Sequence, residues 1–184
     1  MQKRGEIITD TSIAFVIGPF TVRWYGIIIS LAILFGIVIA AHLAKKMGED
    51  TDDLINIALI AVPLAILGAR LYYVAFNWDF YSQNPAEILK TWHGGMAIHG
   101  AVLAGILVVF FYTKMKDLCF RRWLDILCVP LILGQAVGRW GNFFNQEAYG
   151  YETNMPWAMY IDGAYRHPTF LYESLWELAV FLLL

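Results

Sequence analysis

The chain reads GRWGNFFNQEAYG at residues 138–150, directly after the apolar run of residues 126–137. An arginine, two asparagines, a glutamine and a glutamate therefore appear where an apolar segment reaches a membrane boundary. In a helix, Gln135, Arg139 and Asn142 fall at i, i+4 and i+7, on one face. Three glycines form the neighbouring stripe: Gly134, Gly138 and Gly141. The stretch predicts a membrane helix with one polar side and one side bare enough for another helix to approach closely.

The composition is that of an integral membrane protein. Of the 184 residues, 59% are hydrophobic and 15% are charged, and the mean hydropathy is +0.57; both values are typical of membrane-spanning chains. The cysteines, Cys119 and Cys128, indicate spare core thiols rather than a disulfide framework or a metal site. The sequence contains no nucleotide-binding loop, zinc ligand set or Gly-x-Ser-x-Gly nucleophile. We therefore expect no metal, no cofactor and no nucleic-acid partner.

Apolar runs of spanning length predict about five transmembrane helices. The expected segments are Trp24–Ala44, Leu54–Phe76, Gly95–Tyr112, Trp123–Phe143 and a fifth opened by Pro168, a residue that a first helical turn tolerates. The predicted fold is an all-α polytopic bundle that forms a single transmembrane domain over residues 1–184. The fifth helix is still apolar at Leu184, so we expect the sequence to be truncated at its C-terminus.

Polar and interfacial segments join these helices. Residues 1–23 are expected to form an interfacial lead-in, because Ile13–Ile17 is too short to span a bilayer and Gly18-Pro19 turns the chain. Residues 77–93 are predicted to be a polar loop, and residues 144–169 an outer polar loop.

The distribution of basic residues predicts the orientation. The loops after the first and third helices carry six: Lys45, Lys46, Lys114, Lys116, Arg121 and Arg122. The loops after the second and fourth helices carry Lys90 and Arg166. The positive-inside rule places the first pair of loops in the cytoplasm and the N-terminus outside. Three N-terminal residues oppose this assignment: Lys3, Arg4 and Arg23.

This topology brings polar residues from several helix ends to the same, outer side of the membrane. They are Tyr25, Arg70, His99, Arg139, Asn142, His167 and Glu173. Scattered core residues have no reason to share one depth, so the convergence predicts a site. It offers cations, amides and a histidine but no protein nucleophile. Such a set suits a reaction in which the substrate supplies the nucleophile and the protein binds an anionic headgroup.

The two arginines each have a structural alternative. Arg70 lies with Tyr73 and Asn77 on a polar stripe, and both a binding role and inter-helix pairing are open for it. An arginine at mid-membrane depth costs roughly 2.5 to 3.5 kcal/mol on insertion scales, so Arg139 beside Asn142 favours an anion clamp. Its alternative is a buried ion pair with Glu147 or Glu173.

The remaining candidates also have two interpretations. His99 is either a base or a structural histidine on an apolar face, and its depth favours chemistry; His93 is expected to be only interfacial. Tyr25 is first of all a residue of the aromatic belt. Glu147 either pairs with an arginine or is a solvated acid. Two acids, Glu173 and Glu177, share a face at i and i+4 and are predicted to pair with other helices.

The stretch at residues 138–150 resembles the signature of the prolipoprotein diacylglyceryl transferase family. Four further motifs match that family in order: GPFTVRWYG at 18–26, GARLYY at 68–73, GGMAIHG at 94–100 and HPTFLYE at 167–173. The resemblance implies a bacterial cytoplasmic-membrane enzyme with about seven helices in the complete family. In this family, the lipobox cysteine of a prolipoprotein attacks the glyceryl carbon of phosphatidylglycerol, and glycerol phosphate is released. The implied partners are phosphatidylglycerol, prolipoprotein signal peptides and membrane lipids.

The resemblance also implies roles for individual residues. His99 is the expected base for a thiol whose ordinary pKa is about 8.5, and Arg139 the cation for the leaving phosphate. Tyr25 is expected to orient the donor or the thiol. The expected phosphatidylglycerol-binding residues are Arg139, Asn142, Glu147, Gly150 and Arg70.

Two departures from the family pattern are small and one is large. His93 stands where an acid or amide is usual, and Ala101 where glycine is usual. The family's last two helices, the later with another functional arginine, are missing from this sequence. Two alternatives to the transferase are a membrane transporter or binder of an anionic lipid or solute, for which internal repeats are expected, and an inactive truncated fragment.

Overall fold

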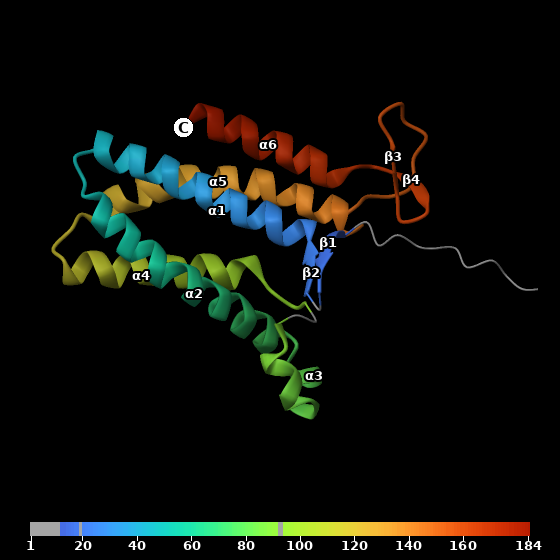
Figure 1. The fold of residues 1–184 in the computed structure, drawn as a ribbon, viewed down its shortest axis with the longest axis horizontal. Coiled ribbons are helices and arrows are strands. Elements are labelled where there is room, and N and C mark those ends of the chain that lie inside the picture. The colour runs from blue at the N-terminus through green and yellow to red at the C-terminus, as the bar shows by residue number, and fades with distance from the viewer. Residues whose placement is uncertain (1–11, 19, 92–93) are drawn as a thin grey trace, which may run out of the picture. The chain divides into compact units, whose positions relative to one another are not determined.

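The computed structural model describes residues 12–18, 20–91 and 94–184. Helices dominate, which confirms the predicted all-α membrane class (Figure 1). The elements in chain order are β1 Ile13–Ile17, β2 Phe20–Arg23, α1 Trp24–Lys46, α2 Thr51–Phe76, α3 Trp78–Gln83, η1 Pro85–Leu89, α4 Ile98–Met115, α5 Phe120–Phe144, β3 Met159–Ile161, β4 Ala164–Arg166 and α6 Thr169–Leu183. The strands pair as two short antiparallel hairpins, β1 with β2 and β3 with β4.

Four helices in the described part of the chain are long and apolar enough to cross a membrane: α1, α2, α4 and α5. The predicted fifth helix forms as α6, Thr169–Leu183. The total number of spanning helices and the outside position of the N-terminus stay predictions.

The helix boundaries differ from the expected ones where local chemistry decides them. The third predicted helix begins at Ile98 rather than Gly95, because Gly94 and Gly95 adopt φ values of 85° and 79°, outside the helical region. The helix predicted to start at Trp123 begins at Phe120, so Arg121 and Arg122 belong to its first turn and not to a loop. Asp50 caps α2 by accepting from the backbone N–H of Asp52 at 2.9 Å.

The predicted loops contain structure of their own. The lead-in forms the β1–β2 hairpin, and the polar loop after α2 contains α3 and η1. The loop at 144–169 contains β3 and β4, whose register pairs Met159 with Arg166 and Ile161 with Ala164. The predictions for residues 1–11, for Pro19 and for His93 lie outside the described residues.

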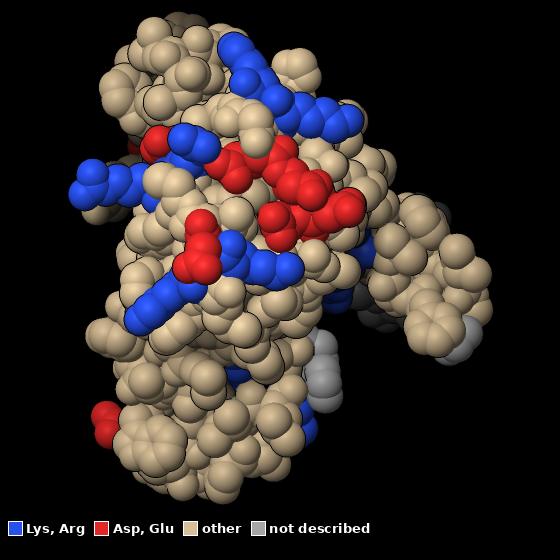
Figure 2. Space-filling view, turned by 90° about the vertical axis from the view of Figure 1, so that its left-hand side faces the viewer, with Lys and Arg blue, Asp and Glu red and all other residues tan. Residues whose placement is uncertain are grey.

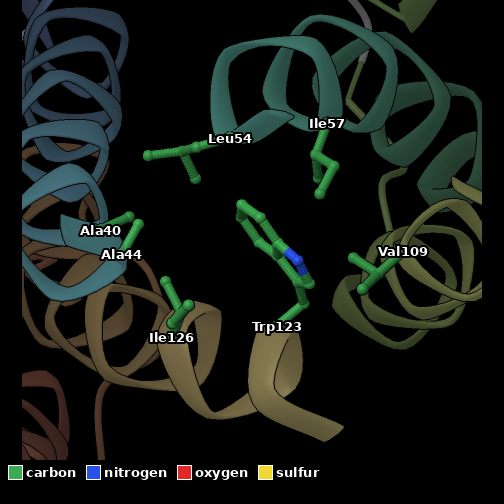
Figure 3. Packing of buried hydrophobic residues seen from close by; sticks show 7 residues of the cluster. All are labelled: Ala40, Ala44, Leu54, Ile57, Val109, Trp123 and Ile126. Carbon is green, nitrogen blue, oxygen red and sulfur yellow. The ribbon is translucent and has the colours of Figure 1, made fainter. Parts of the chain in front are cut away.

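The chain divides into two compact units, and each is described separately. One comprises residues up to Ile39 together with Val129–Leu184, and the other Ala40–Cys128. The core of the second unit surrounds Trp123, which is fully buried (Figure 3). Its neighbours come from the end of α1, the start of α2, the later part of α4 and the start of α5: Ala40, Ala44, Leu54, Ile57, Val109 and Ile126. The predicted core thiols are not part of this core, because Cys119 and Cys128 are both exposed.

Charged side chains gather where α1 joins α2 and α4 joins α5. Figure 2 shows lysines and arginines around a group of acids on this face. Arg122 pairs with Glu49 at 2.8 Å, and the Tyr112 hydroxyl donates to Asp53 at 2.7 Å. Acids in the first turn of α2 and lysines in the last turn of α1 also match the helix dipoles. The six basic residues of the orientation prediction thus belong to one unit.

In the first unit, α5 packs against both α1 and α6. Gly36 of α1 lies next to Pro130 of α5. A Cβ atom added to this glycine would be 3.6 Å from the Cβ atom of Pro130. The buried Ser174 hydroxyl of α6 donates to the Ala136 carbonyl of α5 at 2.8 Å. Phe170, which is 1% exposed, fixes the start of α6 against α5. These contacts position the polar end of α5.

Candidate functional site

In the second unit, the guanidinium of Arg70 lies among backbone carbonyls. Arg70 is only 5% exposed. Its Nε donates to Ile88 at 2.9 Å, its Nη1 to Gly94 at 2.6 Å and Gly95 at 2.8 Å, and its Nη2 to Glu87 at 2.5 Å and Lys90 at 3.3 Å. The charge also lies 5.2 Å from the centre of the Tyr81 ring. Arg70 therefore connects the C-terminal half of α2 to the segment that precedes α4.

Two glycines bring α2 and α4 into direct backbone contact next to His99. A Cβ atom on Gly100 would lie 2.2 Å from the Gly68 carbonyl oxygen, and one on Gly68 would lie 2.6 Å from the Gly100 oxygen. The His99 ring stacks on Tyr72 of α2 with a centroid distance of 5.9 Å. His99 is exposed, and its ring nitrogens make no hydrogen bond to a described residue. The motifs at 68–73 and 94–100 therefore pack directly against each other.

In the first unit, Arg139 of α5 pairs with two acids of α6. Its Nη1 lies 2.6 Å from Glu173 and its Nε 3.7 Å from Glu177. The pairing predicted for these two acids is confirmed. The arginine side chain remains 36% exposed, Glu173 is 48% exposed and Glu177 is 16% exposed. A partly open guanidinium that contacts carboxylates through Nη1 and Nε can still donate hydrogen bonds to an oxyanion through its remaining N–H groups.

Asn142 and Glu147 meet at the turn that ends α5. The side-chain amides of Asn142 and Asn145 donate to one Glu147 oxygen at 3.0 and 3.1 Å. Gln146 and Ala148, on either side of the acid, have φ values of 54° and 52°, a conformation that non-glycine residues rarely adopt. Glu147 therefore accepts from amides rather than pairing with an arginine in the described chain.

Gly141 explains the position of Tyr25. A Cβ atom on Gly141 would lie 2.4 Å from the Tyr25 ring, so only glycine lets the start of α1 contact α5 there. Trp24 stacks on Phe144 with a centroid distance of 5.3 Å. Tyr25 itself is 41% exposed, so part of this residue is accessible.

Gly150 lies against the chain that enters α6. Its N–H donates to the His167 carbonyl at 3.0 Å, and a Cβ atom there would lie 2.9 Å from the His167 side chain. An open pocket of about 450 Å³ borders it, lined by Tyr149, Gly150, Tyr151 and Arg166. The hydrogen bond to Asp162 raises the pKa of Tyr149, with Arg166 opposing. The Tyr149 phenol thus stays protonated at neutral pH.

The predicted residues fall into two groups. Arg70 and His99 lie in the second unit, whereas Tyr25, Arg139, Asn142, Glu147 and Gly150 lie in the first. Convergence of the two groups on one site stays a prediction. Among the described residues, no group of three or more His, Cys, Asp or Glu side chains is arranged to hold a metal.

The chain matches known proteins over nearly its whole length. The model of the prolipoprotein diacylglyceryl transferase family matches residues 12–184. The phosphatidylglycerol–prolipoprotein diacylglyceryl transferase of Clostridioides difficile is 45% identical over 172 residues, which are 94% of this chain and 69% of the relative. The chain belongs to this family. The enzyme of the same name from Finegoldia magna is 49% identical with the same coverage. That from Trichormus variabilis is 47% identical over 178 residues, 91% of this chain and 63% of the relative.

Membership makes the chain a membrane transferase of lipoprotein maturation, and it gives no support to the transporter alternative. Sequence reasoning named Glu173 as a possible partner of Arg139 but missed the partners of His99, His167 and Arg70. Two of the missed contacts could have been suspected from the sequence, because both tyrosines lie within family motifs. They are the stack of Tyr72 on His99 and the contact between the Tyr172 hydroxyl and His167 Nδ1 at 3.1 Å. The carbonyl partners of Arg70 could not have been found from the sequence, because every residue type carries the same backbone carbonyl.

Proposed function

We propose that this chain carries the diacylglyceryl-transfer site of a bacterial cytoplasmic-membrane enzyme. The donor is phosphatidylglycerol, and the acceptor is the lipobox cysteine following a prolipoprotein signal peptide. The thiol sulfur attacks the glyceryl carbon, a C–S bond forms, and the C–O bond to phosphate breaks. The thiol proton leaves with a base, and glycerol phosphate departs as an anion. Family membership supports this proposal, and the paired but still open Arg139 is the observation that carries it.

His99 is the proposed base. Thiolate is the nucleophilic form of cysteine, and a free thiol is mostly protonated at neutral pH. The exposed imidazole of His99 has ring nitrogens that no described residue uses, so it can accept the thiol proton. Tyr72, stacked beneath the ring, restricts its orientation.

Arg139 is the proposed phosphate ligand. Glu173 contacts the guanidinium through Nη1 and is the more exposed of its two acids. In our proposal the donor phosphate takes the place of Glu173, while the less exposed Glu177 keeps its contact with Nε. When the Glu173 carboxylate moves away from the guanidinium, there is also less negative charge at the site to repel the incoming phosphate. An arginine fork matches a phosphate bidentately, which a lysine cannot do.

The rest of the set surrounds the headgroup. The Asn142 amide, now on Glu147, is proposed to donate to the glycerol part of the donor, with Glu147 accepting from a donor hydroxyl. Tyr25 is proposed to orient the donor or the thiol through its hydroxyl. Gly150 matters as a backbone position, because its contact with His167 leaves no space for a Cβ atom. Arg70 has its N–H donors on backbone carbonyls, so it is not included in the proposed headgroup set.

The test measures donor affinity and turnover in membrane vesicles that contain the protein, phosphatidylglycerol and a lipobox peptide. Arg139→Lys and Arg139→Gln are expected to weaken donor binding and to lower turnover by about 10²-fold or more, the magnitude for a lost oxyanion ligand. Glu173→Gln removes only the competing acid and is expected to retain activity.

The double variant Arg139→Gln with Glu173→Gln distinguishes the ion-pair alternative. If the arginine only neutralises a carboxylate, this variant regains function; we expect it to stay inactive. Near-normal donor affinity in Arg139→Gln would refute the phosphate role. Arg122→Gln is the matched control, because it also breaks an arginine–glutamate pair, with Glu49, but outside the proposed site. Its activity is expected to match that of the wild type.

A further inference from the structure

We propose that Arg70 is a positioning residue, which fixes the turn before His99 and does not bind the donor phosphate. The inference rests on the proposed function in that His99 is taken as the base. It starts from the five hydrogen bonds that the buried guanidinium makes to backbone carbonyls of described residues. An arginine has five N–H donors in a fixed fork.

Every donor of the Arg70 fork has an acceptor. The acceptors are all backbone carbonyls. The Nε–H donates to Ile88, the two Nη1 hydrogens donate to Gly94 and Gly95, and the two Nη2 hydrogens donate to Glu87 and Lys90. A phosphate at Arg70 would have to displace carbonyls that are themselves partly buried and would then lack a donor, which is unfavourable. The geometry therefore favours a structural ligand, the backbone of the segment, over a substrate.

The fixed segment leads directly to His99. Arg70 holds the carbonyls of Gly94 and Gly95, and both glycines are in the left-handed region. Two residues later the Ala97 N–H donates to the Ala69 carbonyl at 3.1 Å, and α4 begins at Ile98. His99 is the second residue of that helix. The path from Arg70 to the imidazole is thus a short turn bonded at both ends to consecutive residues of α2, Ala69 and Arg70.

A loosened turn should affect chemistry rather than donor binding. Misplacement of a reacting group by on the order of 1 Å can cost about 10²-fold in rate. We expect Arg70→Lys and Arg70→Gln to lower kcat about 10- to 100-fold, with KM for phosphatidylglycerol within about twofold of the wild type. Lysine has three donors on a point charge and cannot replace a planar fork of five, so Arg70→Lys should not rescue. A raised KM with unchanged kcat would overturn the proposal in favour of donor binding, and so would rescue by lysine.

A glycine pair gives a second perturbation with a matched control. Alanine at either position has the same left-handed backbone penalty. At Gly95 the added Cβ would lie 2.6 Å from Arg70 Nη1 and 2.7 Å from the Tyr73 ring, whereas at Gly94 it meets nothing within 4 Å. Gly95→Ala is expected to lower kcat several-fold more than Gly94→Ala does. Equal losses in the two variants would refute the role of the Arg70 contact.

Amide hydrogen exchange tests the fixed turn without any activity assay. The amides of Gly94 and Ala97 are expected to exchange faster in Arg70→Gln, while the core amides around Val109 stay protected. Unchanged exchange at residues 94–97 would overturn the inference. If wild-type vesicles transferred no diacylglyceryl group, the proposed function would fail, yet the exchange comparison would still decide whether Arg70 fixes the turn.

Discussion

At the residue scale, His99 has an exposed ring on Tyr72 and no hydrogen bond to a described residue. A general base contributes about 10²- to 10⁴-fold to a rate. We therefore expect His99→Asn to lower turnover by that factor, while its affinity for phosphatidylglycerol stays nearly unchanged. The measurement is turnover and donor affinity in vesicles.

His42→Asn is the control for this prediction. His42 is an exposed histidine of α1 that belongs to none of the family motifs, and its substitution should leave turnover unchanged. Wild-type turnover in His99→Asn would mean that the histidine is structural and that another group accepts the thiol proton.

At the element scale, the contact between α2 and α4 depends on Gly68 and Gly100. A Cβ atom on Gly100 has no room between the Gly68 carbonyl and Tyr72, and overpacking typically costs about 1–3 kcal/mol. We expect Gly100→Ala to lower the midpoint of thermal unfolding in detergent and to reduce activity by moving His99 away from α2.

Gly105 provides the comparison on the same helix. A Cβ atom there would meet nothing within 4 Å, and alanine favours a helix by about 1 kcal/mol over glycine. Gly105→Ala should be as stable as the wild type or slightly more stable. Equal midpoints for the two variants would mean that the glycines are not needed for close packing.

At the scale of the whole molecule, the orientation in the membrane can be tested directly. Lysines and arginines gather at the α1–α2 and α4–α5 connections (Figure 2), which the positive-inside rule places in the cytoplasm. Asn77, which caps the other end of α2, is then outside. A cysteine at Asn77 should react with an impermeant maleimide in intact cells, and one at Lys114 only after permeabilisation.

The background for this experiment must lack both native thiols, because Cys119 and Cys128 are exposed. Cys119→Ser with Cys128→Ser is the parent. Labelling at position 114 but not at 77 would reverse the topology, and with it the side of the membrane on which the proposed chemistry occurs.

The sequence by itself determined the membrane class and, to within a few residues at each end, four helices that are long and apolar enough to cross a membrane. The residues that it assigns to the site stay a prediction. Long apolar runs and dense motifs such as GRWGNFFNQEAYG carry this information locally. It placed the start of α4 at Gly95 rather than Ile98, because two left-handed glycines override the apolar pattern there. It also misjudged the exposure of the cysteines, because an apolar run does not tell which of its faces is covered.

Only the tertiary structure decided which groups the site residues contact. Arg139 and Arg70 are the same residue type near helix ends. The family resemblance placed both among the donor-binding residues, while the residues themselves left inter-helix pairing open for Arg70. In the structure, Arg139 faces two carboxylates and stays partly open, whereas Arg70 is buried with its donors on carbonyls. The physical reason is that a guanidinium's role depends on which acceptors the fold brings to it, and backbone carbonyls, present in every residue, leave no trace in a sequence.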